Sequence, residues 1–175
     1  MIKRHATQIG NSTIRKKSRR VSKVSSKTVT KVIKDLTDSM RFHGLVGMAA
    51  PQIGLNLQVF VTEIRKTKTR KPKEVDLFRV YINPRVVSSS KDQSIGYEGC
   101  GSVASGQLFG PVRRPKDIVI KAQDNEGDIF TLRASGLLAR VIQHEVDHLN
   151  GVVYLDRVTD LKKLMSRDEY IKRKR

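Results

Sequence analysis

One seven-residue stretch, QHEVDHL at positions 143–149, constrains this chain more than any other part of the sequence. It contains the pattern H-E-x-x-H, and the apolar residues before it recur at the three- and four-residue spacing of a helix that begins at the N-cap Ser135. On that helix His144 and His148 would lie one turn apart on one face, where two imidazoles can bind one metal ion. Glu145 beside them could take a proton from a water held by that ion. The histidine pair could equally be packed or solvated, so a metal site needs a third ligand.

Cys100 is the only cysteine of the chain and the candidate third ligand. No intrachain disulfide can form, which is typical of a reducing compartment. Gly99 and Gly101 flank it, so the backbone can bend closely around a ligand. A thiolate and two imidazoles would leave a fourth position for water, although a free cysteine is also commonly a small buried apolar residue. The turn-rich loop at 44–54 adds Gln52, whose amide could stabilise an oxyanion.

The formal net charge of +18 predicts attraction to polyanions, such as nucleic acid, the ribosome or an anionic membrane surface. It could also be a solubilising surface. The four Tyr and five Phe do not interleave with basic runs, so the sequence offers no stacking platform for single strands. No apolar run reaches the roughly 18 residues of a membrane span, and no secretory signal is present.

The N-terminal stretch 1–34 is Ser-rich and basic and has no acidic residue, which resembles an organellar transit peptide. Helical periodicity within it favours a different interpretation, a helix from about Ser26 to Arg41 that belongs to the folded domain. Only about the first 20 residues then remain as a possible flexible basic segment. We therefore expect a cytoplasmic protein, with an organellar location as the alternative.

The remaining pattern predicts an α+β fold, with mixed, mostly antiparallel strands packed around a central helix that carries the HExxH motif. The chain is expected to form a single domain over 1–175. The predicted strands are 57–64, 78–83 with a possible continuation to 88 after Pro84, the hairpin 116–123 and 128–134, and 152–155. We expect a basic loop at 65–74, a polar loop at 88–96, and a last helix at 160–172 that ends in the basic tail 172–175.

Three motifs together resemble the peptide deformylase family: GLVGMAAPQIG at 44–54, EGCGS at 98–102 and QHEVDHLNG at 143–151. The resemblance covers roughly residues 9–160. It implies a metal-dependent hydrolase that removes the N-formyl group from the N-terminal formyl-methionine of nascent polypeptides and releases formate. It also implies one divalent metal ion per chain, Fe(II) in the cell with Zn, Ni or Co as substitutes, and a monomeric enzyme.

The resemblance also implies roles for individual residues. Catalytic and oxyanion roles fall to Glu145, as general base and then acid, and to Gln52 and the backbone N–H of Gly101. The metal ligands would be Cys100, His144 and His148. The substrate would contact Val46 and Gly47, with the methionine side chain in an apolar pocket formed by Val141 and Ile142. We further predict that Glu98 and Arg114 pair and brace the Cys100 loop.

The sequence departs from the family pattern near the cysteine. Gly101 stands where the family often has Leu or Glu, and Ala104 stands where Pro is frequent. The stretch 105–110 is also slightly long. A backbone donor survives at Gly101, but a pocket wall is lost, so the substrate range is left open.

Two other functions compete with this one. A zincin-type protease would take its third ligand from downstream acids, which here are Asp156, Asp160, Asp168 and Glu169, and would leave Cys100 unexplained. A basic ribosome-binding or RNA-binding protein with a degenerate site would explain the charge. Ribosome binding and deformylase activity can also be combined in one protein. The basic N-terminal segment and the C-terminal helix would then dock the enzyme near the ribosomal exit, and this binding should weaken as the salt concentration rises.

Overall fold

The computed structural model describes residues 4–67, 72 and 74–173. Parts of the predicted basic loop 65–74, and the last two residues of the predicted basic tail 172–175, lie outside that range. In the described residues the strands form two sheets whose strand pairs are all antiparallel. The five-stranded sheet has the order β1 (Gly47–Ala49), β2 (Val59–Ile64), β3 (Asp76–Ser89), β6 (Asp117–Gln123) and β7 (Ile129–Ser135). The three-stranded sheet has the order β4 (Gln93–Gly99), β5 (Leu108–Pro115) and β8 (Met165–Ser166).

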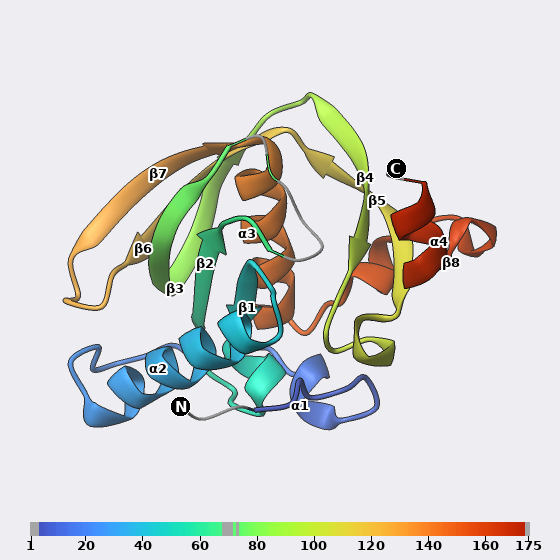
Figure 1. The fold of residues 1–175 in the computed structure, drawn as a ribbon. Helices are drawn as coiled ribbons and strands as arrows, with labels where there is room; N and C mark the ends of the chain where they lie inside the picture. The colour runs from blue at the N-terminus through green and yellow to red at the C-terminus, as the bar shows by residue number, and fades with distance from the viewer. Residues whose placement is uncertain (1–3, 68–71, 73, 174–175) are drawn as a thin grey trace.

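The motif helix α3 (Gly136–Leu149) lies behind the large sheet in Figure 1, between that sheet and the smaller one. Its apolar face includes Ala139 and Ile142, both with no exposed surface. They pack in one cluster with Phe60 and Tyr81, whose rings stack at 4.3 Å on the large sheet. Burying each large apolar side chain contributes about 1.5–3 kcal/mol. The predicted α+β arrangement around this helix is confirmed.

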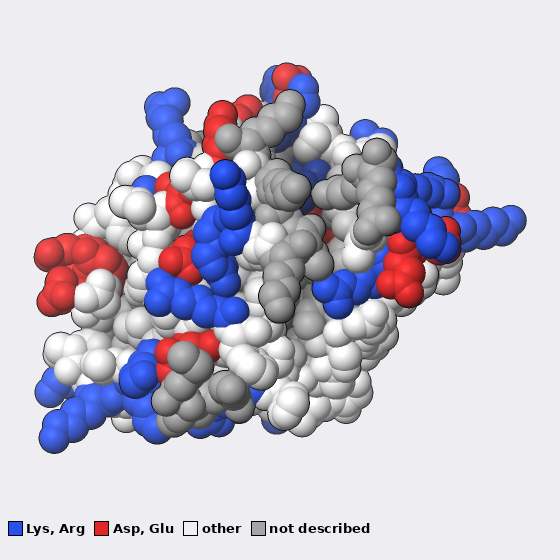
Figure 2. Space-filling view, viewed as in Figure 1, with Lys and Arg blue, Asp and Glu red and all other residues white. Residues whose placement is uncertain are grey.

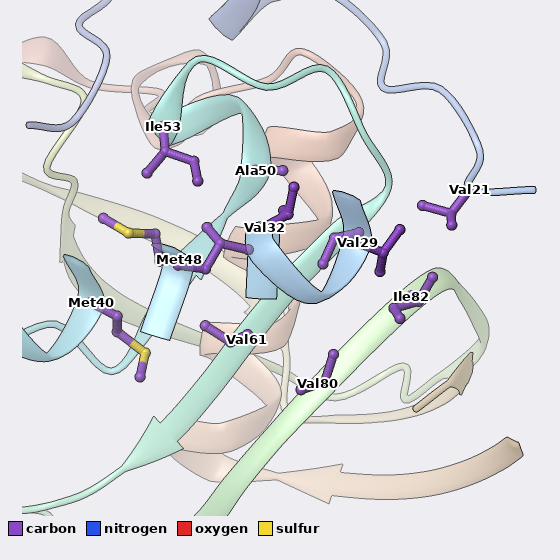
Figure 3. Close-up of a cluster of buried hydrophobic side chains, with 12 residues drawn as sticks. Val21, Val29, Val32, Met40, Met48, Ala50, Ile53, Val61, Val80 and Ile82 are labelled. Carbon is purple, nitrogen blue, oxygen red and sulfur yellow. The ribbon is translucent and has the colours of Figure 1, made fainter. Parts of the chain in front are cut away.

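Helix α2 (Lys27–Phe42) confirms the helix expected at 26–41. The hydroxyl of Ser26 accepts a hydrogen bond from Val29 N and caps the N-terminus. The buried stripe of α2, which includes Val29, Val32 and Met40, packs against Met48 and the start of the large sheet (Figure 3). The periodicity alone therefore located this element within one residue at each end.

The segment before α2 is packed onto the domain from its first described residues. Ile14, in the single-turn helix α1 (Ser12–Arg15), has no exposed surface. Ser18 N donates to the carbonyl of Leu149 at 2.8 Å, at the far end of α3. These contacts tie Ile14 and Ser18 to the body of the domain and argue against the flexible segment considered from the sequence. A single buried isoleucine leaves no periodic pattern that could have indicated this.

Several element predictions in the polar parts of the chain are wrong. The predicted loop 88–96 contains the end of β3 and the start of β4. The possible continuation of the strand to 88 after Pro84 is confirmed, because a register shift between Ile82 and Arg85 lets the ladder from β3 to β6 resume past the proline. Strands β4 and β5 were missed, since they carry several glycines, prolines and charges.

The ends of the remaining segments also differ from the prediction. The loop at 44–54 contains β1 and the 3₁₀ turn η1 (Ala50–Ile53). The stretch predicted as a strand at 152–155 instead enters the 3₁₀ turn η3 (Tyr154–Arg157). The expected helix 160–172 is broken into η4 (Leu161–Lys163), β8 and the short helix α4 (Arg167–Lys172). Pairing of β8 with β5 accounts for the break.

Basic side chains lie in separate groups on the face shown in Figure 2, among them groups over the region of α2 and over the region of α4. An acidic group lies at the turn between β6 and β7 at the left edge. None of the described helices is long and apolar enough to cross a membrane.

Candidate metal centre and active site

The structure brings Cys100, His144 and His148 together. Cys100 follows the last residue of β4, and both histidines project from α3. One ligand atom from each residue lies within 4.8 Å of the other two, and Cys100 Sγ is 3.2 Å from His148 Nε2. Among the described residues this is the single group of three or more metal-ligating side chains that converges in this way.

The chemistry of these three residues fits a divalent metal ion. Burial raises the pKa of the Cys100 thiol, but the positive charge of His148 and hydrogen bonds from both imidazoles hold that pKa well below its usual value. The thiolate is the form that binds metals. The backbone N–H of Ser102 and the amide Nε2 of Gln52 also point at the sulfur, at 3.4 and 3.5 Å. A thiolate with two imidazoles suits zinc or iron.

A buried charge network orients His144. Glu98 Oε2 lies 2.9 Å from His144 Nδ1, so that nitrogen donates to the carboxylate and Nε2 is left for the metal cluster. Arg114 donates to both oxygens of Glu98, at 2.7 and 2.9 Å, and to Asp147 at 2.9 Å. Arg140 donates to Glu98 Oε1 at 2.7 Å. The predicted pairing of Glu98 with Arg114 is therefore present, within a larger network.

The pKa values of this network follow from those contacts. Burial opposes ionisation of Glu98, but the hydrogen bonds from Arg114 and His144 outweigh it and hold the pKa of the carboxyl far below its usual value. Burial likewise lowers the pKa of His144, whereas its bonds to Cys100 and Glu98 raise it well above the usual value. Arg140 and Asp147 were not singled out from the sequence. Arg140 could have been, because it precedes His144 by one helical turn.

Glu145 lies next to the cluster and is 3% exposed. Its Oε2 atom has no hydrogen-bond partner among the described residues. Burial raises the pKa of Glu145 to about 7, against the lowering effect of His144 and His148. A carboxylate with a pKa near neutrality can both accept and donate a proton at physiological pH. Gly47 leaves the space for this side chain, since a Cβ there would lie 2.5 Å from Glu145 Oε1.

The two predicted oxyanion donors lie on either side of the cysteine. The side-chain oxygen of Gln52 accepts from Ala49 N at 2.8 Å, which turns its NH₂ group toward the sulfur. The carbonyl of Gly101 accepts from Gln8 Nε2 at 2.8 Å. Thr7 N donates to the carbonyl of Gln52 at 2.8 Å. The N-terminal segment thus holds both loops, a contact that no sequence pattern indicated.

A groove opens in front of the cluster, and Val46, Gly47 and Val141 line it as expected. Ile142 does not: it has no exposed surface and packs in the core against the large sheet. Successive helical residues point about 100° apart, so Val141 and Ile142 cannot both face the groove. Leu137, one turn before Val141, takes the place that was assigned to Ile142. Groove residues that the sequence did not reveal include Leu45, Tyr97, Phe109, Arg140 and Tyr170.

The downstream acids considered for a zincin-type protease do not reach this cluster. Asp156 accepts hydrogen bonds from Arg15 and from Val153 N, and Asp160 caps η4. Cys100 instead stands beside the two histidines. The protease interpretation is therefore wrong.

Two imidazoles from one helix, a thiolate from a neighbouring strand end and a buried carboxylate beside a groove define a metal-dependent hydrolase. Comparison with known proteins narrows this class. The family model described as polypeptide deformylase matches residues 3–164. The chain belongs to the polypeptide deformylase family.

Individual relatives agree along most of the chain. The peptide deformylase of Dictyoglomus thermophilum is 38% identical over 90% of this chain and 94% of its own length. Peptide deformylase 2 of Prochlorococcus marinus is 39% identical over 89% of this chain and 74% of its own length. The fold agrees as well. The actinonin complex of a Synechococcus elongatus peptide deformylase has a TM-score of 0.78 at 32% identity, covering 90% of this chain and 80% of that one. The Thermotoga maritima peptide deformylase has a TM-score of 0.80 at 29% identity, covering 91% of this chain and 100% of that one.

Proposed function

We propose that this chain removes the formyl group from the N-terminal formyl-methionine of nascent polypeptides and releases formate, with Cys100, His144 and His148 as its metal ligands. The observation that carries the proposal is the convergence of these three ligand atoms within 4.8 Å, next to a buried carboxylate. Family membership supports the reaction. The residue roles below extend the proposal to this particular chain.

Each step of the hydrolysis has a candidate group. A divalent ion held by Cys100, His144 and His148 would supply Lewis-acid chemistry, which makes a water molecule more acidic and a carbonyl more electrophilic. Glu145 accepts the proton of the attacking water and returns it to the nitrogen of the leaving amine. The formyl carbon becomes tetrahedral, and its oxygen gains negative charge. The Gln52 amide and the backbone N–H of Gly101 donate hydrogen bonds to that oxygen.

The groove suits an extended peptide whose N-terminal residue is methionine. β1 is the terminal strand of the large sheet, and Gly47 at its start lines the groove. A substrate backbone can add beside Gly47 as a further strand. The flexible methionine side chain would then lie against Val46, Leu137 and Val141, which line the groove and pack in one apolar cluster.

We propose Fe(II) as the metal in the cell, by analogy with the family, with Zn, Ni or Co as substitutes that the same donor set could hold. Thiolate and imidazole bind all four ions, and availability then selects among them.

We also infer a monomer, because one chain supplies every ligand and both oxyanion donors. A cytoplasmic location follows from the proposed substrate, and docking of basic surface on the ribosome would bring the enzyme to it.

The decisive experiment measures metal content and formate release on protein purified without oxygen. Wild-type protein should hold about one metal ion per chain and release formate from formyl-Met-Ala-Ser. Glu145→Gln keeps the shape of the side chain but removes the base, so turnover should fall at least ~10²-fold with the metal content unchanged. Metal binding without formate release would refute the proposed substrate. Absence of bound metal would refute the ligand set.

A further inference from the structure

A second groove, of about 820 Å³, lies apart from the proposed catalytic pocket. No described residue lines both. The two grooves lie on different faces of α3, since Val146 and Asn150 line the second groove whereas His144 and Glu145 line the first. We call the second one the basic groove. Its cations are Lys17, Arg20, Arg85 and Lys121, and no aspartate or glutamate is among its described lining residues.

Two of these cations are placed against each other. Arg85 in β3 and Lys121 in β6 are direct partners in the antiparallel ladder, and both are exposed. Like charges at such positions repel each other and destabilise the sheet. Within the described part of the chain neither forms an ion pair or a side-chain hydrogen bond. A negatively charged partner would convert this repulsion into binding energy.

The opposite wall of the basic groove is held in place by hydrogen bonds. Val21 N donates to Asn83 Oδ1 at 2.8 Å, and Asn83 Nδ2 donates to Val21 O and Gln123 Oε1, both at 2.9 Å. Ser18 N donates to the carbonyl of Leu149 at 2.8 Å. The cations at 17 and 20 therefore start from a fixed backbone, and little ordering is needed when a ligand binds.

We propose that the basic groove binds the phosphodiester backbone of a base-paired RNA. Phosphate oxygens are bound by Arg and Lys together with amide side chains. Gln58, Gln123 and Asn150 line the groove, and each amide NH₂ makes one hydrogen bond to a backbone carbonyl and keeps a second hydrogen to donate, whereas Asn83 uses both of its hydrogens within the fold. None of its lining residues is aromatic, so it has no platform on which single-stranded bases could stack. Its hollow shape suits a convex backbone better than a flat bilayer. The acidic turn 124–128 borders the groove at Ile129 and marks where the RNA must leave it.

The basic groove is thus a specific surface for the ribosome docking proposed above, and the phosphate groups of RNA are the ligand that it would bind. It depends on the proposed function only for the choice of RNA among polyanions, because nascent chains are made on an RNA-rich particle. The cations, their repulsion and the rigid wall do not depend on any deformylase activity.

The test measures binding of a fluorescein-labelled RNA duplex by fluorescence anisotropy across a range of salt. Four phosphate contacts predict a slope of about −3.5 for the logarithm of affinity against the logarithm of salt. The double variant Arg85→Glu with Lys121→Glu should weaken binding about tenfold or more. Because two of the four phosphate contacts are lost, the slope should become shallower, with a magnitude of about 2 or smaller. Lys91→Glu with Lys162→Glu is the matched control. It makes the same change in charge at residues that line neither groove, and it should weaken binding much less.

Equal losses in the groove and control variants would mean that binding follows total charge, and would overturn the inference. Wild-type binding to phosphatidylserine vesicles without binding to RNA would overturn it in favour of a membrane surface. The groove variant should release formate at the wild-type rate, because the two sites share no residue. A wild-type protein that binds RNA through the groove but releases no formate would refute the proposed function and leave this inference standing.

A single substitution separates binding from stability. Arg85→Glu replaces the like-charge pair by an opposite-charge pair with Lys121 across the same ladder. The Tm should rise by about 1–3 °C, while RNA binding weakens. Substitution of a residue that only supports the fold would not raise the Tm and weaken RNA binding at the same time. A fall in Tm with unchanged RNA binding would contradict the proposed role of Arg85.

Discussion

Gly47 has no side chain at the one point where β1, the helix α3 and the proposed base meet. A Cβ there would lie 2.5 Å from Glu145 Oε1 and 2.7 Å from Val141 Cγ1. Such contacts cannot persist, so Glu145 would have to move. The absence of a methyl group is therefore what leaves room for the Glu145 carboxylate beside β1.

Gly47→Ala should lower kcat by about 10²-fold, because a displacement of about 1 Å in a catalytic group has an effect of that size. The metal content should stay near that of wild type, since the atoms nearest to the new methyl group belong to Glu145 and Val141, and neither residue is a proposed ligand. Steady-state formate release and metal analysis check the two expectations. An unchanged kcat would mean that Glu145 does not act from its observed position.

Gln52→Ala should reduce kcat by ~10²–10³ without abolishing turnover, the usual effect of removing one oxyanion donor. Its amide is already turned by Ala49 N toward the cysteine, so the donor is positioned before substrate binds. Steady-state kinetics with formyl-Met-Ala-Ser provide the measurement. A loss of only a few-fold would exclude Gln52 from this role and leave Gly101 as the main protein donor.

At the scale of elements, β4, β5 and α3 are joined by the buried carboxylate of Glu98. It is 7% exposed and accepts from Arg114, Arg140 and His144. Removing one partner of a buried ion pair costs about 3–5 kcal/mol, because the other charge is left uncompensated. Here Arg114 keeps Asp147 as a second partner, so the cost should fall toward the lower end of that range.

The folded-state pKa of Glu98 is depressed, so its stabilisation is present above the unfolded pKa of about 4.3 and is lost as the pH falls through the folded-state value. Glu98→Gln should therefore destabilise the protein strongly at pH 7 and progressively less as the pH drops below about 4.5. Urea unfolding of metal-free wild type and variant at several pH values measures the difference. A difference that does not change with pH would rule out this linkage.

The sequence predicted those parts of the fold that have a periodic pattern of apolar residues. Helices α2 and α3 carry apolar stripes, and both were located from them. Strands β4 and β5 carry glycine, proline and charge, and their pairing depends on a partner far along the chain, so no local pattern indicated them. The same limit applies at the site. The three motifs predicted the cluster, but Ile142 was assigned to the wrong face of the helix, and Gln8 was missed because its partners are distant in sequence.

At the scale of the whole molecule, a metal ion held by Cys100 at the end of β4 and by the two histidines of α3 would join the smaller sheet to that helix. An ion that binds the folded state alone stabilises it by about 3–4 kcal/mol at 100 to 1,000 times its Kd. For a chain of this size, chelation should lower the Tm by about 5–15 °C. Differential scanning calorimetry with and without a chelator makes the measurement. Cys100→Ala serves as the control, since a protein that has lost a ligand should show little further effect of the chelator.

The contacts between the N-terminal segment and the loops that carry Gln52 and Gly101 also affect when the site can form during synthesis of the chain. Gln8 bonds to Gly101, which lies 93 positions later, and Thr7 bonds to Gln52. The helix that carries both histidines comes later still in the chain. Contacts so distant in sequence form slowly and require nearly the whole chain. During synthesis the catalytic site would thus be among the last parts of the molecule to assemble, and a partly made chain would have no activity.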